Sequence, residues 1–247
     1  MSEETTLRKY LDETHNPRDL CCHFLRRADA RLREWGVVVH VHRDFGPLVD
    51  VNAANQGNEW FNLMPMFHPD CFPTGEAFWL EGRARDSGEA VMTQAARCYH
   101  IIDDSLADAL TSLRLFYAEP AAMKGPDEVC VCNAPSASRL GGKLLYSGGT
   151  WARRDWRGKG TAAILPRISR VLALRQWEPD YTISLVDPVL IPKGIVRSYG
   201  YHCAEEGVAW SNSPSQGDLD LALIWMDRAE LVRDLANCLE LAGPIPA

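Results

Sequence analysis

The sequence predicts an α/β protein, because short β-branched runs alternate with amphipathic stretches of helical period. Three observations support this class. Two apolar runs, 78–84 and 90–98, are joined by the glycine-containing loop 85–89, which is the pattern of an antiparallel hairpin. A strand ending at Trp151 and Ala152 leads into a basic, glycine-bearing turn and then into a helix. A further alternating run, 181–186, follows that helix as another strand.

The N-terminal part of the chain precedes the hairpin. Residues 1–16 predict a polar tail or a loosely held helix, and 20–35 a helix with one apolar face that Gly36 ends. Residues 37–42 form the first predicted strand. The segment 44–74 has no clear period and contains several asparagines and prolines. A stretch of this length in a compact domain is usually functional, so we expect loops and short helices over the substrate side.

Between the hairpin and the basic turn, the pattern predicts a helix over 103–117. Residues 118–133 are loop-like, apart from a short apolar run at 129–132. A strand then covers 144–152. Its pair Gly148 and Gly149 indicates a β-bulge or a close backbone approach.

The C-terminal part continues the alternation of strands and helices. An apolar stripe predicts a helix after the basic turn, although Pro166 lies inside it and predicts a kink or an irregular first turn. A short helical stretch ends at Tyr199 and Gly200. A last strand over 218–225 and a helix over 227–241 close the chain.

The basic turn predicts a compact anionic ligand. Residues 151–175 carry seven basic side chains and one acid, a net +6 in a chain of net −7, which leaves −13 on the rest. Backbone N–H groups of a glycine-bearing turn, a helix N-terminus and fixed cations together suit a pyrophosphate. The phosphate-loop pattern GxxxxGK[ST] and the dinucleotide pattern GxGxxG are both absent.

What remains is R-x-x-G-x-A, at residues 157–162, approached by the run WARRDWRGKG. This segment resembles the acetyl-CoA signature of the GCN5-related N-acetyltransferases, Q/R-x-x-G-x-G/A. The resemblance spans roughly 36–225 and matches weakly over 44–74. It implies a mixed, mostly antiparallel central sheet with helices on both faces, and a bulged strand that splays from its neighbour. The cofactor-binding residues that it implies are Trp151, Ala152, Arg157, Gly158, Lys159, Gly160, Thr161 and Ala162.

The resemblance also implies an acid that protonates the departing thiolate and a base for the amine. The usual tyrosine and asparagine positions hold Val196 and Val189 instead. Tyr199 follows Val196 by three residues, so it falls on nearly the same helix face and is the candidate acid. Glu81 on the hairpin and Asp187 at the end of the next strand are the candidate bases. Solvated, capping or core roles are the alternatives for all three.

The composition also limits the domain organisation and the other functional classes that this chain could belong to. With no Pro/Gly/Ser-rich linker or repeat, we expect one domain over 17–247, with an enlarged substrate-side insert near 44–74. The eight cysteines lie in apolar contexts and suit buried, reduced thiols of a cytoplasmic protein. We expect no membrane span and no signal peptide. The acidic balance argues against nucleic-acid binding, and pairs such as Cys98 and His100 lack a second ligand pair, so no metal is expected.

The sequence therefore predicts an N-acetyltransferase that uses acetyl-CoA as cosubstrate and no metal. The acceptor would be a small-molecule or peptide amine, and a homodimer stays open. One alternative is a transferase for a longer acyl-CoA. The other is a non-catalytic acyl-CoA-binding or interaction module of the same fold, which the missing tyrosine and asparagine favour.

Overall fold

The computed structural model describes residues 5–13, 19–58, 60–73, 75–158 and 161–240. Within them the strands form a nine-stranded sheet in the order β1-β2-β3-β4-β6-β7-β9-β8-β5. Every neighbouring pair is antiparallel except β6 and β7, which are parallel. The strands are β1 (Thr5–Thr6), β2 (Val37–His42), β3 (Ala77–Ala84), β4 (Ala90–Ile101), β5 (Val129–Cys132), β6 (Gly142–Ala152), β7 (Tyr181–Val186), β8 (Cys203–Ser213) and β9 (Gly217–Asp227).

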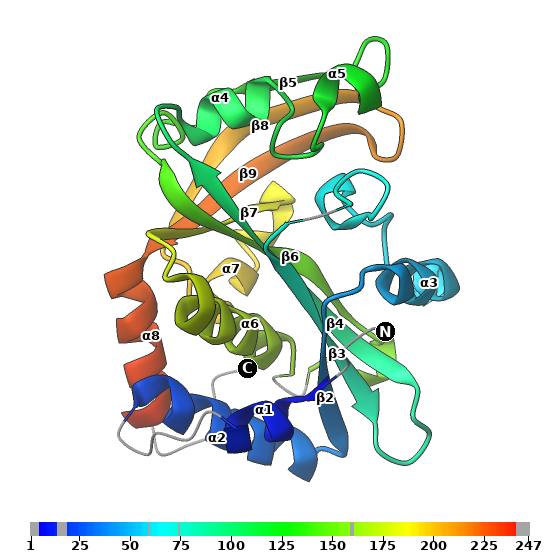
Figure 1. Ribbon diagram of the computed structural model, residues 1–247, viewed down its shortest axis with the longest axis vertical. Helices are drawn as coiled ribbons and strands as arrows, with labels where there is room; N and C mark the ends of the chain where they lie inside the picture. Colours follow the sequence, from blue (N-terminus) through cyan, green and yellow to red (C-terminus); the bar gives the residue numbers. More distant parts are fainter. Residues whose placement is uncertain (1–4, 14–18, 59, 74, 159–160, 241–247) are drawn as a thin grey trace.

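Helices cover both faces of this sheet, as Figure 1 shows. On one face lie α1 (Leu7–Glu13), α2 (Leu20–Glu34), α6 (Thr161–Trp177), α7 (Ile195–Ser198) and α8 (Arg228–Glu240). On the other face lie α3 (Gly46–Asn55), the 3₁₀ helix η2 (Pro65–Phe67) and α4 (Leu106–Thr111). The remaining short helices are α5 (Pro120–Met123), η1 (Gln56–Asn58), η3 (Arg154–Trp156) and η4 (Pro188–Leu190). The fold class predicted from the sequence is confirmed.

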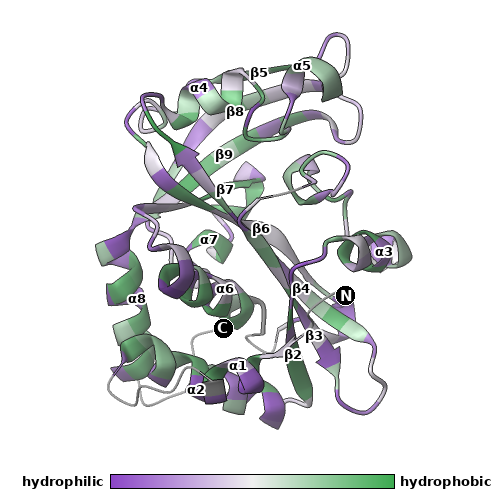
Figure 2. Ribbon diagram, in the orientation of Figure 1, coloured by the Kyte–Doolittle hydropathy of each residue, from purple (hydrophilic) through white to green (hydrophobic). Residues whose placement is uncertain are grey.

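The two faces follow from the alternation of side chains along each strand. On β3, Phe78 and Leu80 join the apolar cluster under α2, α6 and α8, whereas Trp79 joins the cluster under α3 and α4. We call these the helix face and the insert face. Both carry apolar residues, while the β3–β4 loop is hydrophilic (Figure 2). The central strands β3 and β4 and the middle of β6 are mostly buried on both faces, so a ligand can reach this part of the sheet only at strand ends and where strands splay apart.

Three segments differ from the sequence pattern. Residues 5–13 form β1 and α1, and Leu7 and Leu11 are buried in the core. The helix predicted over 103–117 is wrong in extent, because α4 covers only Leu106–Thr111. A capping box between Ser105 and Asp108 starts it, and positive φ angles at Asp103 and Leu113 bound it. The apolar run 129–132 is the edge strand β5, which pairs with β8.

The other predicted elements are found with small shifts at their ends. Gly36 follows α2 with a φ of +78°, the left-handed conformation that ends a helix. The segment 44–74 contains short helices, as expected, namely α3 and two 3₁₀ helices, and buried residues of this segment pack on the insert face. Pro166 lies inside α6, which begins at Thr161. All eight cysteines are free, and five of them are buried. None of the helices described is long and apolar enough to cross a membrane.

Candidate active site

The candidate site lies where the two parallel strands separate. β6 and β7 pair through only three residues each, Leu144 to Tyr146 against Tyr181 to Ile183. β6 continues to Ala152 and β7 to Val186 beyond the last pair. Past Tyr146 the β7-facing edge of β6 therefore has no strand partner in this register. We call the space between the diverging strands the notch.

A β-bulge lies on β6 beside the notch. Thr93 of β4 pairs with Trp151, but Ala95 pairs with Gly148, so β6 carries one extra residue there. Gly149 lies in this bulge and has a φ of +62°. Its carbonyl accepts a hydrogen bond from the Thr93 hydroxyl at 2.9 Å. The bulge predicted from the paired glycines is confirmed. It turns the end of β6 away from a regular ladder.

Gly148 serves a packing role rather than a conformational one. A Cβ at Gly148 would lie 2.7 Å from Cε1 of Tyr146 and 3.2 Å from Cε2 of Phe67. The Tyr146 ring thus passes beneath Gly148, and its side chain interacts with Ser184 and the backbone of Leu185 on β7. Tyr146 closes the floor of the notch where the strands part.

The predicted cofactor-binding residues continue from the end of β6. Trp151 and Ala152 are its last two residues and are buried. The guanidinium Nε of Arg157 donates to the Ala152 carbonyl at 2.8 Å, and Gly158 has a φ of +75°. The backbone of Thr161 and Ala162 begins α6. Lys159 and Gly160 lie outside the described residues. The fold thus brings the end of β6, the turn and the start of α6 together.

The charge of this region is smaller than the sequence indicates. Arg167 makes a bidentate ion pair with Asp234, at 2.8 and 3.0 Å, and Arg170 is fully buried. Arg175 pairs with Asp19 at 2.7 Å. Arg153 lies 3.0 Å from Glu89 and 2.8 Å from Asp155, whose hydrogen bonds raise its pKa. Four of the seven cations in 151–175 are therefore buried or paired with acids, so the net charge counted from the sequence overstates what a ligand at the turn would meet.

The insert covers the end of β6 on the insert face. Trp60 stacks on Trp151 with ring centroids 4.8 Å apart and an interplanar angle of 9°. Its neighbour Phe61 is 85% exposed. The insert thus combines an aromatic ring anchored on the end of β6 with an exposed aromatic ring at the next residue. The aromatic pair at 60–61 was the sequence signal for this contact, but its partner on β6 was not predictable.

The Glu81 side chain lies on the insert face, level with Trp151 near the end of β6. It pairs in register with Thr93, which pairs with Trp151, so two strand spacings, roughly 10 Å, separate it from Trp151. Glu81 Oε2 lies 2.9 Å from His42 Nε2 and 2.8 Å from Arg83 Nη2. Burial alone would raise its pKa, but the hydrogen bonds from His42 and Arg83 outweigh burial and lower it. Glu81 is therefore a buried anion near the notch.

The other two predicted catalytic residues lie elsewhere around the notch. Asp187 is exposed at the end of β7, and its carboxylate caps η4 by accepting from the Val189 amide at 2.9 Å. Tyr199 ends α7 on the helix face, half-buried, and burial raises its pKa. Glu81 and Tyr199 thus lie on opposite faces of the sheet. A group in the notch would therefore lie about 10 Å or more from Glu81, with β4 and β6 between them.

A buried polar chain along the helix face of β6 was missed at the sequence level. Gln94 accepts from the Thr150 hydroxyl at 2.5 Å and donates to the Ser147 hydroxyl at 3.0 Å. Tyr201 lies beside Ser147, and the Arg170 guanidinium stands 4.9 Å from its ring centroid. Single polar residues inside apolar strands were the available signal, but only the fold shows that they meet.

Two of the buried residues on this face of β6 carry polar atoms without a hydrogen-bond partner. Among the described residues, Nε and Nη1 of Arg170 and the hydroxyl of Tyr201 make no hydrogen bond of good geometry. Burial raises the pKa of Tyr201, and Arg170 opposes this effect. Buried polar atoms without partners are costly, so this face of the notch suits a polar ligand group or water.

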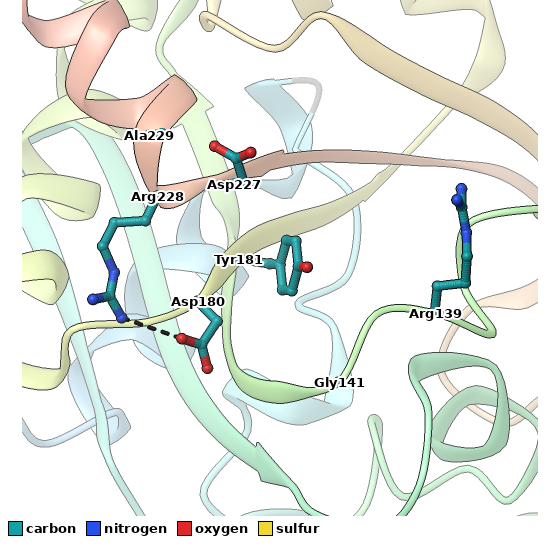
Figure 3. Close-up of a pocket in the computed structure, with 7 residues that line it drawn as sticks. All are labelled: Arg139, Gly141, Asp180, Tyr181, Asp227, Arg228 and Ala229. Carbon is teal, nitrogen blue, oxygen red and sulfur yellow. Dashed lines mark hydrogen bonds and ion pairs between the residues drawn. The ribbon is translucent and has the colours of Figure 1, made fainter.

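An open cavity of about 590 Å³ lies at the opposite end of β6 and β7. Figure 3 shows that Arg228 pairs with Asp180 there, while Arg139, Tyr181 and Asp227 surround the opening. Two arginines and two aspartates line the cavity, so their formal charges offset each other. None of the sequence-predicted site residues lines this cavity.

No protein-family model and no curated protein match the sequence. Solved structures resemble the fold. They include NAA60 of Arabidopsis thaliana with a bisubstrate analogue, at TM-score 0.45 and 15% identity, over 77% of this chain and 98% of that chain. AAC(6')-Ib in complex with ribostamycin and coenzyme A has a TM-score of 0.44 and 12% sequence identity, and the match covers 80% of this chain and 97% of that chain. The ribosomal-protein-S5-alanine acetyltransferase from Vibrio fischeri has a TM-score of 0.44 and 8% sequence identity, and the match covers 76% of this chain and 92% of that chain.

At TM-scores below 0.5 these likenesses assign no function to this chain. The sheet itself carries the features that the family resemblance implies, namely one parallel pair that splays, a bulge on its first strand and a helix after the glycine-bearing turn. The resemblance to the GCN5-related N-acetyltransferases is confirmed at the level of the fold.

Proposed function

We propose that this protein is an acyl-CoA-dependent N-acyltransferase that moves an acetyl group from acetyl-CoA to an amine. The separation of β6 from β7 beyond three residue pairs is the observation that carries the proposal. It leaves a strand edge of β6 open to the amide groups of an extended ligand. That edge leads directly into a turn and the N-terminus of α6, where backbone N–H groups favour phosphate.

Each residue then has a defined task. The turn and Arg157, with Lys159 and Gly160, would hold the pyrophosphate, while Trp151 and Ala152 would meet the thioester through their backbone. An N–H at the end of β6 stabilises the charge that develops on the carbonyl oxygen. The amine attacks the carbonyl carbon, so a C–N bond forms and the C–S bond breaks.

Two proton transfers complete the reaction. We propose Glu81 as the group that draws the proton from the amine, through water because of its roughly 10 Å separation from Trp151. Asp187 is the second candidate, although it caps η4. Tyr199 is the proposed proton donor to the thiolate. Tyr201, whose buried hydroxyl lies beside Ser147, is the structural alternative.

The rival function is a non-catalytic acyl-CoA-binding module. It is favoured by Val196, which is 3% exposed and brings no hydroxyl to the position where the resemblance implies a tyrosine. The two functions share the notch and differ only in turnover.

Two measurements on the purified full chain test the proposal. Calorimetric titration with CoA tests the site, and thiol release from acetyl-CoA with a panel of amino acids, polyamines and peptide N-termini tests the chemistry. Binding with acceptor-dependent release supports the transferase. Binding without release for the whole panel supports the module, and absence of CoA binding contradicts both.

A further inference from the structure

A separate group of metal-ligating side chains lies at the far end of β4. Cys98 and His100 are two residues apart on this strand and therefore point to the same face. Glu76 immediately precedes β3, and its carbonyl accepts a hydrogen bond from the Cys98 amide at 2.8 Å. One ligand atom from each of the three residues lies within 4.8 Å of the others.

We propose that Glu76, Cys98 and His100 form a binding site for a divalent cation of the zinc class. A thiolate, an imidazole nitrogen and a carboxylate oxygen are three of the donor types that Zn²⁺ prefers, and three protein ligands leave a fourth position for water. The thiol and the imidazole argue against Mg²⁺ and Ca²⁺, which take oxygen ligands. Two anionic ligands would neutralise the charge of the ion.

Small side-chain rotations bring the three atoms to binding geometry. Bonds of about 2.0–2.3 Å in a tetrahedron place the ligand atoms roughly 3.3–3.8 Å apart. His100 Nε2 and Glu76 Oε2 now lie 2.6 Å apart as a hydrogen-bonded pair, and their side chains are 52% and 48% exposed. Both side chains have solvent on one side and can turn once this hydrogen bond breaks, whereas Cys98 is 7% exposed and lies within β4. On binding, the Cys98 thiol releases its proton to solvent, and metal bonds replace the His100–Glu76 hydrogen bond.

The charged neighbours leave the site accessible. Lys143 faces His100 across the β4–β6 ladder, but its ammonium group donates to the Trp177 carbonyl at 2.6 Å. Asp180 accepts from the Lys143 amide at 2.9 Å and pairs with Arg228 at 3.2 Å. Both groups are thus engaged elsewhere, and Asp180 adds negative charge nearby.

This site is distinct from the notch. His100 lies seven residues along β4 from Thr93, which pairs with the end of β6, a separation of roughly 23 Å. A metal there would bind outside the proposed acyl-transfer site and would brace the start of β3 against β4. The sequence could not predict it, because the third ligand comes from the residue just before β3 and has no motif spacing to Cys98.

Metal titration of the full chain, freed of metal by a chelator, tests the proposal. Zn²⁺ is titrated in competition with a chromophoric chelator, and Co²⁺ serves as the spectroscopic probe. We expect one equivalent to bind and Co²⁺ to show a thiolate charge-transfer band that Cys98→Ser abolishes. Glu76→Gln and His100→Gln, at exposed side chains, should each weaken binding by at least roughly tenfold.

A double variant, His68→Gln with Cys71→Ser, is the matched control. These residues also place a histidine near a cysteine, but they belong to no three-ligand group among the described residues. The control should bind Zn²⁺ like the wild type. The proposal is overturned if the wild type binds no more tightly than about 100 μM, or if Glu76→Gln and His100→Gln bind as tightly as the wild type.

Discussion

Replacement of Gly149 by alanine should close the notch at the bulge. Gly149 has a φ of +62°, which costs a residue with a Cβ about 1–2 kcal/mol. The new Cβ would lie 3.1 Å from the Cβ of Ala95, so β4 and β6 must also move apart. Alanine also lowers the conformational entropy of the unfolded chain, which offsets about 0.4–1 kcal/mol of this cost. We expect a net loss near 1 kcal/mol, or roughly 2–4 °C in melting temperature for a chain of this size.

CoA affinity should fall further than stability predicts. If the backbone beside Gly149 meets the ligand, its displacement should weaken CoA binding by about tenfold, or 1.4 kcal/mol, measured by calorimetry. Gly217→Ala is the matched control, because Gly217 has a φ of +70° and a Cβ added there would meet no heavy atom within 4 Å. It should lose similar stability and keep CoA affinity. Equal affinity losses in both variants, or none in Gly149→Ala, would refute the reasoning.

Three further predictions address single side chains. Asp234→Ala leaves Arg167 buried without its partner and should cost about 3–5 kcal/mol in urea unfolding, without reducing the salt dependence of CoA binding. Tyr199→Phe should lower kcat at unchanged CoA affinity and unchanged melting temperature. If kcat falls only in Tyr201→Phe, the proton donor is Tyr201 instead. The pKa of Glu81 is lowered in the fold, so its ion pairs stabilise above its unfolded pKa, about 4.3, and this contribution is lost as pH falls through the lower folded value. The stability difference between wild type and Glu81→Gln, followed by urea midpoints, should therefore shrink as the pH is lowered; a difference that stays constant from neutral pH down to the lowest pH at which the protein remains folded would contradict this.

Much of the fold was predictable because it is local. The hairpin around residues 85–89, the strand into the basic turn and the helix stop at Gly36 each follow from residues close in sequence. The short helix α4 was overestimated, because Asp103 and Leu113 adopt positive φ angles that a helical apolar pattern does not reveal. The edge strand 129–132 is defined by its pairing with β8, which is distant in sequence.

The candidate site was predictable only in its backbone. The two glycines at 148 and 149 indicated the bulge, and the structure places it beside the separation of β6 and β7. Side-chain roles depended on partners far along the chain. Asp234 neutralises Arg167, and His42 and Arg83 hold Glu81 ionised. Neither relationship leaves a pattern in the sequence, so the basic charge was overestimated and the environment of Glu81 was not foreseen.

Hydrogen exchange with and without CoA tests the central claim most directly. The β6 edge past Tyr146 has no partner strand on the β7 side, so its amides should exchange more slowly when an extended ligand occupies the notch. We predict that CoA protects peptides covering residues 147–158 and the start of α6, and leaves those around Arg139, Asp180 and Arg228 unchanged. Protection confined to the cavity at the opposite end of β6, or none along 147–158, would contradict the account.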